Sequence, residues 1–542
     1  MVVAGLGVLL LVGVLASAWF VRRGSLAERL GYALILAVGA PPLVTSILAL
    51  GLSRHVTAGL AWGVMLGLLA LFAALHGATR LRHLRLPRPG ADDALVAILT
   101  VAVGAAAAVH YTDAELLLNL AAYLDTGEAK CFYMQTFELT AGLAAGAAGP
   151  RPELFFDIIN TPGNTLFTAG LMPVLGLHTF RILYVALAVA LFLFVRLLAA
   201  ELTGRRGIAT AVALFAVANP YTLSIEVLDR NLIALALSAV LWHAVRVQPR
   251  SHLLHGLIFG ALAGSGLRFL PVIHLAPLLA MYAAGRARPR GYLTFGGAAL
   301  AVAAINLPHL ARHGLHSLGE SEPLWRLVLV AITEHSRTPF LPYPNAELYA
   351  LNLLGHLGLA VAAAVLVGAV VAWRRDRALA ASLVWIVAVP FVVLACQRDW
   401  LEGEKLRILL CGGLAWILWL ALGLDHLFRR GRPGRRLAAA TAALAAVGGI
   451  WLGLAHVDAR ADIETYVRKP LYQTETPAYV TQLREAFAPL TLLPGYHRPF
   501  LKLQYPRKRQ VARSIRANLF GAGSAYLESP WIARWLPARE PP

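Results

Sequence analysis

The chain has 542 residues, of which 58% are hydrophobic and only 14% are charged. A soluble protein of this length carries nearly twice that charged fraction, so the composition excludes an ordinary soluble domain. A net charge of +19 would favour a nucleic-acid partner in a soluble protein. Here, however, the arginines lie in short loops between apolar runs, where they set the orientation of membrane helices, and this argues against nucleic acid.

Apolar runs of about 20 residues recur along the chain and predict an all-α polytopic membrane protein. Helices are expected because backbone groups in lipid must form their hydrogen bonds within their own segment. We expect a bundle of about fourteen transmembrane helices. The predicted segments are 2–20, 30–52, 58–77, 94–110, 179–199, 207–219, 231–246, 252–266, 270–285, 293–310, 353–373, 379–396, 406–427 and 437–455.

Arginine in alternate loops predicts the topology. No basic residue precedes the first apolar run, and Arg22 and Arg23 follow it, so we expect a retained helix with its N-terminus outside. Every second loop is then rich in arginine and cytoplasmic. The arginines of the later loops include Arg80, Arg82, Arg85, Arg88, Arg205, Arg206, Arg246, Arg250, Arg286, Arg288, Arg290, Arg374, Arg375, Arg377, Arg429, Arg430, Arg432, Arg435 and Arg436. We expect a multi-pass protein of a bacterial inner (plasma) membrane.

Three longer polar regions fall on the predicted outer side, namely the loops 111–178 and 312–352 and the tail 456–542. The sequence therefore predicts a membrane domain over 1–455 and a polar extracytoplasmic tail. Within the first loop, Leu166 to Leu175 is apolar but too short to span, so we expect a helix lying at the interface. The second loop is rich in proline and predicts a loop with short helical pieces.

Two acids stand at the outer end of the fourth segment. Asp113 and Glu115 follow Tyr111, and the next stretch, Leu116 to Leu124, is apolar enough to rest against the membrane. A carboxylate at such a junction can accept a proton from an incoming hydroxyl, or it can hold a divalent metal such as Mg²⁺ or Mn²⁺. The alternative is a pair of loop acids that simply face water.

Three further charges are expected near the outer surface. Asp229 lies in the next outer loop, where it is either a second site acid or a helix-start acid favoured by the helix dipole. Arg268 interrupts two apolar segments, and a cation at that depth either binds an anion such as a phosphate or snorkels to the surface. Arg407 follows a loop of mixed charges, which can also pair with one another.

The stretch from Asp113 to Gly127 resembles the first outer loop of GT-C glycosyltransferases, the superfamily related to protein O-mannosyltransferases and lipid A aminoarabinose transferases. In that family an acidic pair precedes an apolar helix and a turn that ends in glycine. The family pair is often adjacent, whereas Ala114 separates the two acids here. The resemblance covers roughly residues 94–310, with weaker traces to about 427. Its usual His-Pro-Pro region reads Asn-Thr-Pro at 160–162.

The resemblance implies a GT-C-like fold and transfer of a sugar from a polyprenyl-phosphate donor to a lipid, glycan or protein acceptor on the extracytoplasmic face. It implies that Asp113 is the general base or a metal ligand, supported by Glu115 and Asp229. Arg268 and Arg407 would then neutralise the phosphate of the donor.

Two other classes of function stay open. One is a transporter or lipid flippase, which buries ionisable residues near the membrane midplane and often shows repeat symmetry. This chain instead concentrates its acids at outer helix ends, which favours the enzyme. The other is a glycan polymerase or ligase of a different fold.

Overall fold

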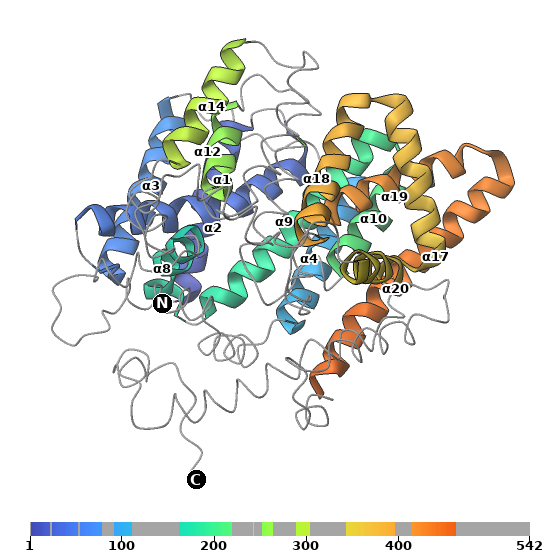
Figure 1. Cartoon of the computed structure of the whole chain (residues 1–542). Coiled ribbons are helices and arrows are strands. Elements are labelled where there is room, and N and C mark those ends of the chain that lie inside the picture. The colour runs from blue at the N-terminus through green and yellow to red at the C-terminus, as the bar shows by residue number, and fades with distance from the viewer. Residues whose placement is uncertain are drawn as a thin grey trace, which may run out of the picture. The chain divides into compact units, whose positions relative to one another are not determined.

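The structure is a computed structural model that describes residues 2–21, 24–52, 55–78, 91–110, 162–176, 178–218, 242, 252–263, 289–303, 343–395 and 413–461. All regular elements in these ranges are helices (Figure 1). This confirms the all-α prediction for the described part of the chain.

Five described helices are long and apolar enough to cross a membrane, which supports the predicted membrane character. They contain the candidate spans Val2–Phe20, Leu26–Ala49, Ala58–Ala78, Ala91–Ala108 and Arg181–Thr203. Shorter apolar stretches are Arg206–Val217, Arg377–Ala388 and Gly413–Phe428. The expected total of about fourteen is not confirmed, since the predicted segments 231–246 and 270–285 fall outside the described residues except for Trp242.

The chain divides into two compact units, each described by itself. In the described part of the chain, the first contains the N-terminal half of α9, up to Ala190, and five complete helices. The bounds of these six helices are α1 (Val2–Phe20), α2 (Leu26–Gly51), α3 (Ala58–Ala78), α4 (Ala91–His110), α8 (Pro162–Leu175) and α9 (His178–Thr203). In this unit α2 packs against α1, α3, α4 and α8.

Small residues let the backbones of the first unit approach closely. Gly13 of α1 lies directly over the carbonyl oxygen of Ala33 in α2, and Gly170 of α8 lies against the backbone of Pro42. Close approach through small residues is the usual basis of helix packing in membranes. The prediction of a short helix over 166–175 is confirmed, but the described side chains of α8 are largely buried, so it packs into the unit instead of lying free on a surface.

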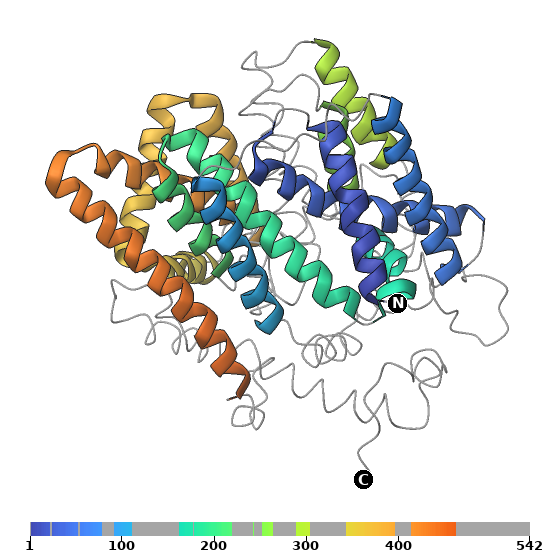
Figure 2. The same ribbon diagram turned by 180° about the vertical axis from the view of Figure 1, so that it is seen from behind.

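Among the described residues, the second unit holds the rest of α9 and seven more helices. Their bounds are α10 (Arg206–Ala218), α12 (His252–Ala263), α14 (Pro289–Ala303), α17 (Tyr343–Arg375), α18 (Arg377–Ala395), α19 (Gly413–Phe428) and α20 (Gly431–Ala461). The central helix is α19, which is buried from Gly413 to Asp425 and contacts α10, α17, α18 and α20. Figure 2 shows α20 from behind as a long straight helix.

Glycine also sets the closest crossing of the second unit. Gly368 of α17 faces the carbonyl oxygen of Trp419 in α19, and Gly423 of α19 faces the carbonyl oxygen of Ala364 in α17. Each helix therefore offers a small residue to the backbone of the other. This reciprocal arrangement leaves no room for a larger side chain at either position.

Two differences between the predicted and observed segments concern α17 and α20. Gly358 has φ 70° and ψ 159° inside α17, so the predicted segment 353–373 is broken there, and the preceding helix reaches back to Tyr343 in the predicted loop 312–352. Glycine allows this break because it adopts positive φ without steric cost. At the other end, α20 continues to Ala461, since neither proline nor glycine interrupts the chain after Gly453.

Candidate functional site

The five predicted site residues, Asp113, Glu115, Asp229, Arg268 and Arg407, all lie outside the described residues. Their roles therefore stay predictions.

The C-terminal end of α4, which leads to Asp113, is anchored to the start of α9. Arg181, in the first turn of α9, donates two hydrogen bonds to the carbonyl oxygen of Ala108, at 3.1 Å from Nε and 2.6 Å from Nη2. The last carbonyls of a helix have no partner within the helix, and a cation is favoured at that end of the helix dipole. Arg181 thus fixes the place from which the chain continues beyond His110.

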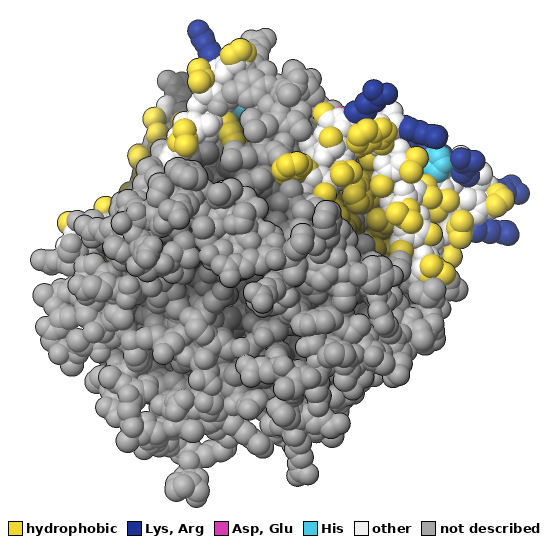
Figure 3. Space-filling view, viewed as in Figure 1, with side chains coloured by type: hydrophobic (Ala, Val, Ile, Leu, Met, Phe, Trp, Pro, Cys, Tyr) yellow, Lys and Arg dark blue, Asp and Glu magenta, His cyan; other side chains and the backbone are white. Residues whose placement is uncertain are grey.

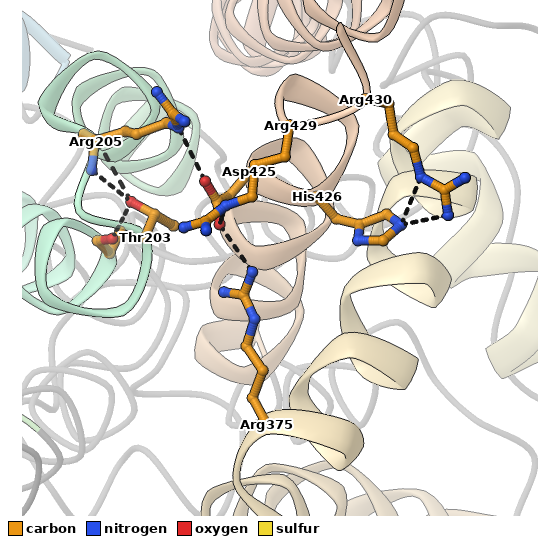
Figure 4. A network of polar contacts seen from close by, with 8 residues as sticks. Thr203, Arg205, Arg375, Asp425, His426, Arg429 and Arg430 are labelled. Atoms are coloured by element: carbon orange, nitrogen blue, oxygen red, sulfur yellow. Dashed lines mark hydrogen bonds and ion pairs between the residues drawn. The ribbon is translucent and has the colours of Figure 1, made fainter.

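A cluster of charges in the second unit is the most developed polar site among the described residues (Figure 4). At its centre is Asp425, in the last turn of α19, whose side chain is completely buried. Three arginines converge on its carboxylate from three separate turns of the chain. We name Asp425 with Arg205, Arg375 and Arg429 the Asp425 cluster.

The contacts of the Asp425 cluster are short and use both carboxylate oxygens. Arg205 Nε donates to Oδ1 at 3.0 Å, while Arg375 Nη2 and Arg429 Nε donate to Oδ2 at 3.1 and 2.9 Å. Arg205 and Arg375 are 37% exposed, and Arg429 is 55% exposed. The acid is thus enclosed, while its partners reach it from the surface.

Local chain geometry aims the arginines at Asp425. Gly204, with φ 69°, forms the turn between α9 and α10, and the Thr203 hydroxyl accepts the backbone N–H of Arg205 at 3.1 Å. The Arg205 guanidinium also lies over the ring of Phe428, 4.2 Å from its centroid. In the turn before α18, Asp376 caps the helix by accepting the N–H of Leu379 at 3.1 Å.

Electrostatics explain why an acid is tolerated at this buried position. Removing a carboxylate from water is expensive, and only good geometry with several charged hydrogen bonds offsets that cost. Three charge-assisted bonds meet this condition, and each is stronger than a neutral hydrogen bond. Because its lone pairs are engaged, the carboxylate is unsuited to act as a general base. The Asp425 cluster is therefore a structural junction that joins α10, α17 and α19.

Sequence reasoning placed the three arginines in turns on one side of the membrane but missed Asp425. The structure brings these turns to one end of the second unit, as expected of loops on a common side. The signal for Asp425 was present in the sequence as the one acid of an apolar run, four residues before Arg429. Opposite charges at this spacing contact each other on a helix.

A metal site is not found in the described part of the chain, where no group of three histidines, cysteines or acids is suitably placed.

Comparison with other proteins adds no relatives: no family model, curated protein or solved structure matches the chain.

Proposed function

We propose that the chain is an integral-membrane glycosyltransferase that transfers a sugar from a polyprenyl-phosphate carrier to a lipid, glycan or protein acceptor on the extracytoplasmic face. The proposal rests on the acidic pair Asp113 and Glu115 and on the resemblance of the following stretch to GT-C enzymes. The observation that supports its membrane setting is the set of five helices long enough to span.

The directions of two helices in the second unit support the proposed sidedness. Both α10 and α18 begin at the Asp425 cluster, at Arg206 and Arg377. They run for 13 and 19 residues, or roughly 20 and 28 Å at the rise of an α-helix. The segments that carry Asp229 and Arg407 start where these helices end. If the arginine turns are cytoplasmic, both segments leave the helices towards the outside.

The two ends of α9 also differ in chemistry, in agreement with the proposal. Its first turn holds the end of α4, from which the chain continues to Asp113, and its last residue, Thr203, leads to Arg205. A helix of 26 residues is roughly 39 Å long, which exceeds the hydrocarbon thickness of a bilayer.

In the proposed reaction, Asp113 accepts the proton of the acceptor hydroxyl as that oxygen forms a bond to the anomeric carbon of the sugar. The bond from that carbon to the phosphate oxygen of the carrier breaks, and its electron pair stays on the prenyl phosphate. Arg268 and Arg407 stabilise the charge that develops on this leaving group, where electrostatic stabilisation contributes most. Glu115 and Asp229 support Asp113, and Asp229 would position the acceptor or, together with Asp113, hold a divalent metal.

Burial of ionisable residues gives little support to the transporter alternative. Among the described residues, buried Glu28 is in the first turn of α2, Asp425 is in the last turn of α19, and Arg196 is about two turns from the end of α9. Transporters place such residues near the middle of the membrane.

The proposal is tested with Asp113→Asn and Asp229→Asn in purified protein, assayed for transfer or hydrolysis of prenyl-phosphate sugars. Loss of a general base lowers the rate by about 10²–10⁴-fold, which we expect for Asp113→Asn. Asp125→Asn, an amide substitution in the same loop, is the matched control and should keep its activity. Full activity in both site variants would overturn the catalytic assignment, and a reporter fused after Asp113 that reads out in the cytoplasm would overturn the sidedness.

A further inference from the structure

The end of the second unit that contains the Asp425 cluster has a large excess of positive charge. The arginines in its three turns and adjoining first helical turns are Arg205, Arg206, Arg374, Arg375, Arg377, Arg429, Arg430, Arg432, Arg435 and Arg436. Asp425 is already engaged by three of them, and the Asp376 carboxylate accepts the N–H of Leu379. With Glu201 in the last turn of α9, three acids stand against ten arginines, so acids balance only a small part of the positive charge.

Four of these arginines have neither an ion pair nor a hydrogen-bonded side chain among the described residues, and we name them the arginine rim: Arg374, Arg377, Arg432 and Arg436. All four are exposed. Their guanidiniums can therefore bind an anion without breaking a contact within the described part of the protein.

Exposed apolar side chains continue from the arginine rim along the same helices. On α20, Arg432 and Arg436 share a face with Ala440, Ala443 and Val447, because these positions recur at helical spacing and all are exposed. Val447 is 57% exposed. The charge is thus confined to one end of this face, and the rest of it is apolar.

On the neighbouring helices too, arginine lies at one end of an exposed face and apolar side chains occupy the rest of it. On α17, Leu366, Val370 and Trp373 are 69%, 54% and 52% exposed and precede Arg374 along the helix. On α18, Trp385 follows Arg377 by two turns on an exposed face. Figure 3 shows the result, with Lys and Arg side chains along one edge of the part formed by α17–α20 and hydrophobic side chains over the adjoining surface.

We propose that the arginine rim binds anionic phospholipids, with the phosphate on the guanidiniums and the acyl chains along the exposed apolar faces of α17, α18 and α20. Charge complementarity favours an anionic phospholipid, because a guanidinium can donate two parallel hydrogen bonds to a phosphate. The apolar faces next to it select a lipid over a soluble polyanion, which would leave them in water. Exposed Trp373 beside Arg374 fits the headgroup level, where tryptophan is enriched.

This inference rests on the membrane setting and is independent of the proposed catalysis. It assigns the rim to the leaflet that carries phosphatidylglycerol or similar lipids. A basic residue near an anionic lipid surface contributes roughly a fivefold increase in binding. Four such residues together correspond to roughly several hundredfold.

The test compares the full-length protein with the variant Arg374→Gln/Arg377→Gln/Arg432→Gln/Arg436→Gln. Each purified protein in neutral detergent is titrated with phosphatidylglycerol or phosphatidylcholine, and bound lipid is counted by native mass spectrometry. The control variant Arg507→Gln/Lys508→Gln/Arg509→Gln/Arg513→Gln removes the same charge from the basic patch of the tail. Because the rim side chains are exposed, the rim variant should keep the elution volume of the parent protein, and the tail variant serves as the control once it shows the same elution volume.

We expect the parent protein and the tail variant to prefer phosphatidylglycerol and the rim variant to bind it several hundredfold more weakly. An equal preference in the rim variant would overturn the proposal, as would equal binding of the two lipids by the parent. A third arm adds glycerol 3-phosphate as a competitor. If it displaces the lipid at an equimolar concentration, the rim binds free phosphate compounds and the assignment to lipid is wrong.

Discussion

The helices of the first unit and the helices of the second unit are stabilised by different kinds of contact. In the first, α1 crosses α2 at Gly13, where backbone contact is the main feature. The second has a comparable crossing at Gly368, but one of its ends is also tied by the Asp425 cluster. Close backbone packing gains many weak dispersion contacts and no strong ones. In the Asp425 cluster, three charged hydrogen bonds meet at one buried carboxylate. The stability of the second unit therefore depends much more on a single residue.

The contacting residues of the two units also differ in how far apart they lie in the sequence. Gly13 and Ala33 are joined by one short connection between consecutive helices, whereas Arg205 and Asp425 are 220 residues apart. A contact of that range closes a long loop, and closing it costs entropy before any bond is gained. We therefore expect the loss of one polar contact to cost less in the first unit, where Arg181 donates to a single backbone carbonyl, than the loss of Asp425 in the second unit.

The largest expected effect is that of Asp425→Ala, which leaves three arginines without their acid. Each charged hydrogen bond that is lost costs about 1.5–3 kcal/mol, less the part that the partly exposed arginines recover from water. Hydrogen exchange of the purified protein should rise sharply in α10, α17 and α19, which the cluster joins, and stay unchanged in α1 and α2. The control is Asp376→Asn, where asparagine still caps α18 and little change is expected. Faster exchange in both units alike would contradict the proposed difference between them.

A smaller effect is expected where a methyl group is added at the crossing of the first unit. The Cβ of Gly13→Ala would meet the carbonyl oxygen of Ala33, so the helices must separate. Overpacking of this kind costs about 1–3 kcal/mol. Gly7→Ala in the same helix meets nothing within 4 Å and is the matched control. Thermal unfolding in detergent should show a lower midpoint for Gly13→Ala alone; equal midpoints would mean that this crossing contributes little.

These variants also show how far the sequence could predict the structure. Apolar runs predicted most helices within a few residues, because a span of fixed length and uniform composition leaves little freedom. Yet Gly7 and Gly13 lie in the same run, and composition cannot tell which one faces a neighbouring backbone. Similarly, the arginine turns were predicted to share one side. Their meeting at Asp425 depends on the packing of α10, α17 and α19, which no local pattern contains.

For the polar sites, the sequence and the structure each revealed a different set of residues. Asp113 and Arg407 were predicted from their place in or next to polar loops and from a family resemblance, both properties of the sequence alone, and their roles stay predictions. The spacing of Asp425 and Arg429 is local, but Arg205 and Arg375 become partners of this acid only when distant turns are brought together, so the full Asp425 cluster was found through distances. Local patterns thus identify candidate residues in polar loops, and tertiary structure is needed for buried polar junctions.

The smallest expected effect concerns the turn that aims Arg205 at the Asp425 cluster. Gly204 has φ 69° and open space around its Cα, so Gly204→Ala meets no atom and costs only backbone strain, about 1–2 kcal/mol. Gly207→Ala, three residues later in α10, also meets no atom within 4 Å and has ordinary helical φ. Alanine is favoured over glycine there, so it should be neutral or slightly stabilising. If Gly204→Ala loses stability in the parent protein but not when Asp425→Ala is already present, the strain acts through the cluster. An equal loss in both backgrounds would show that the turn and the cluster are independent.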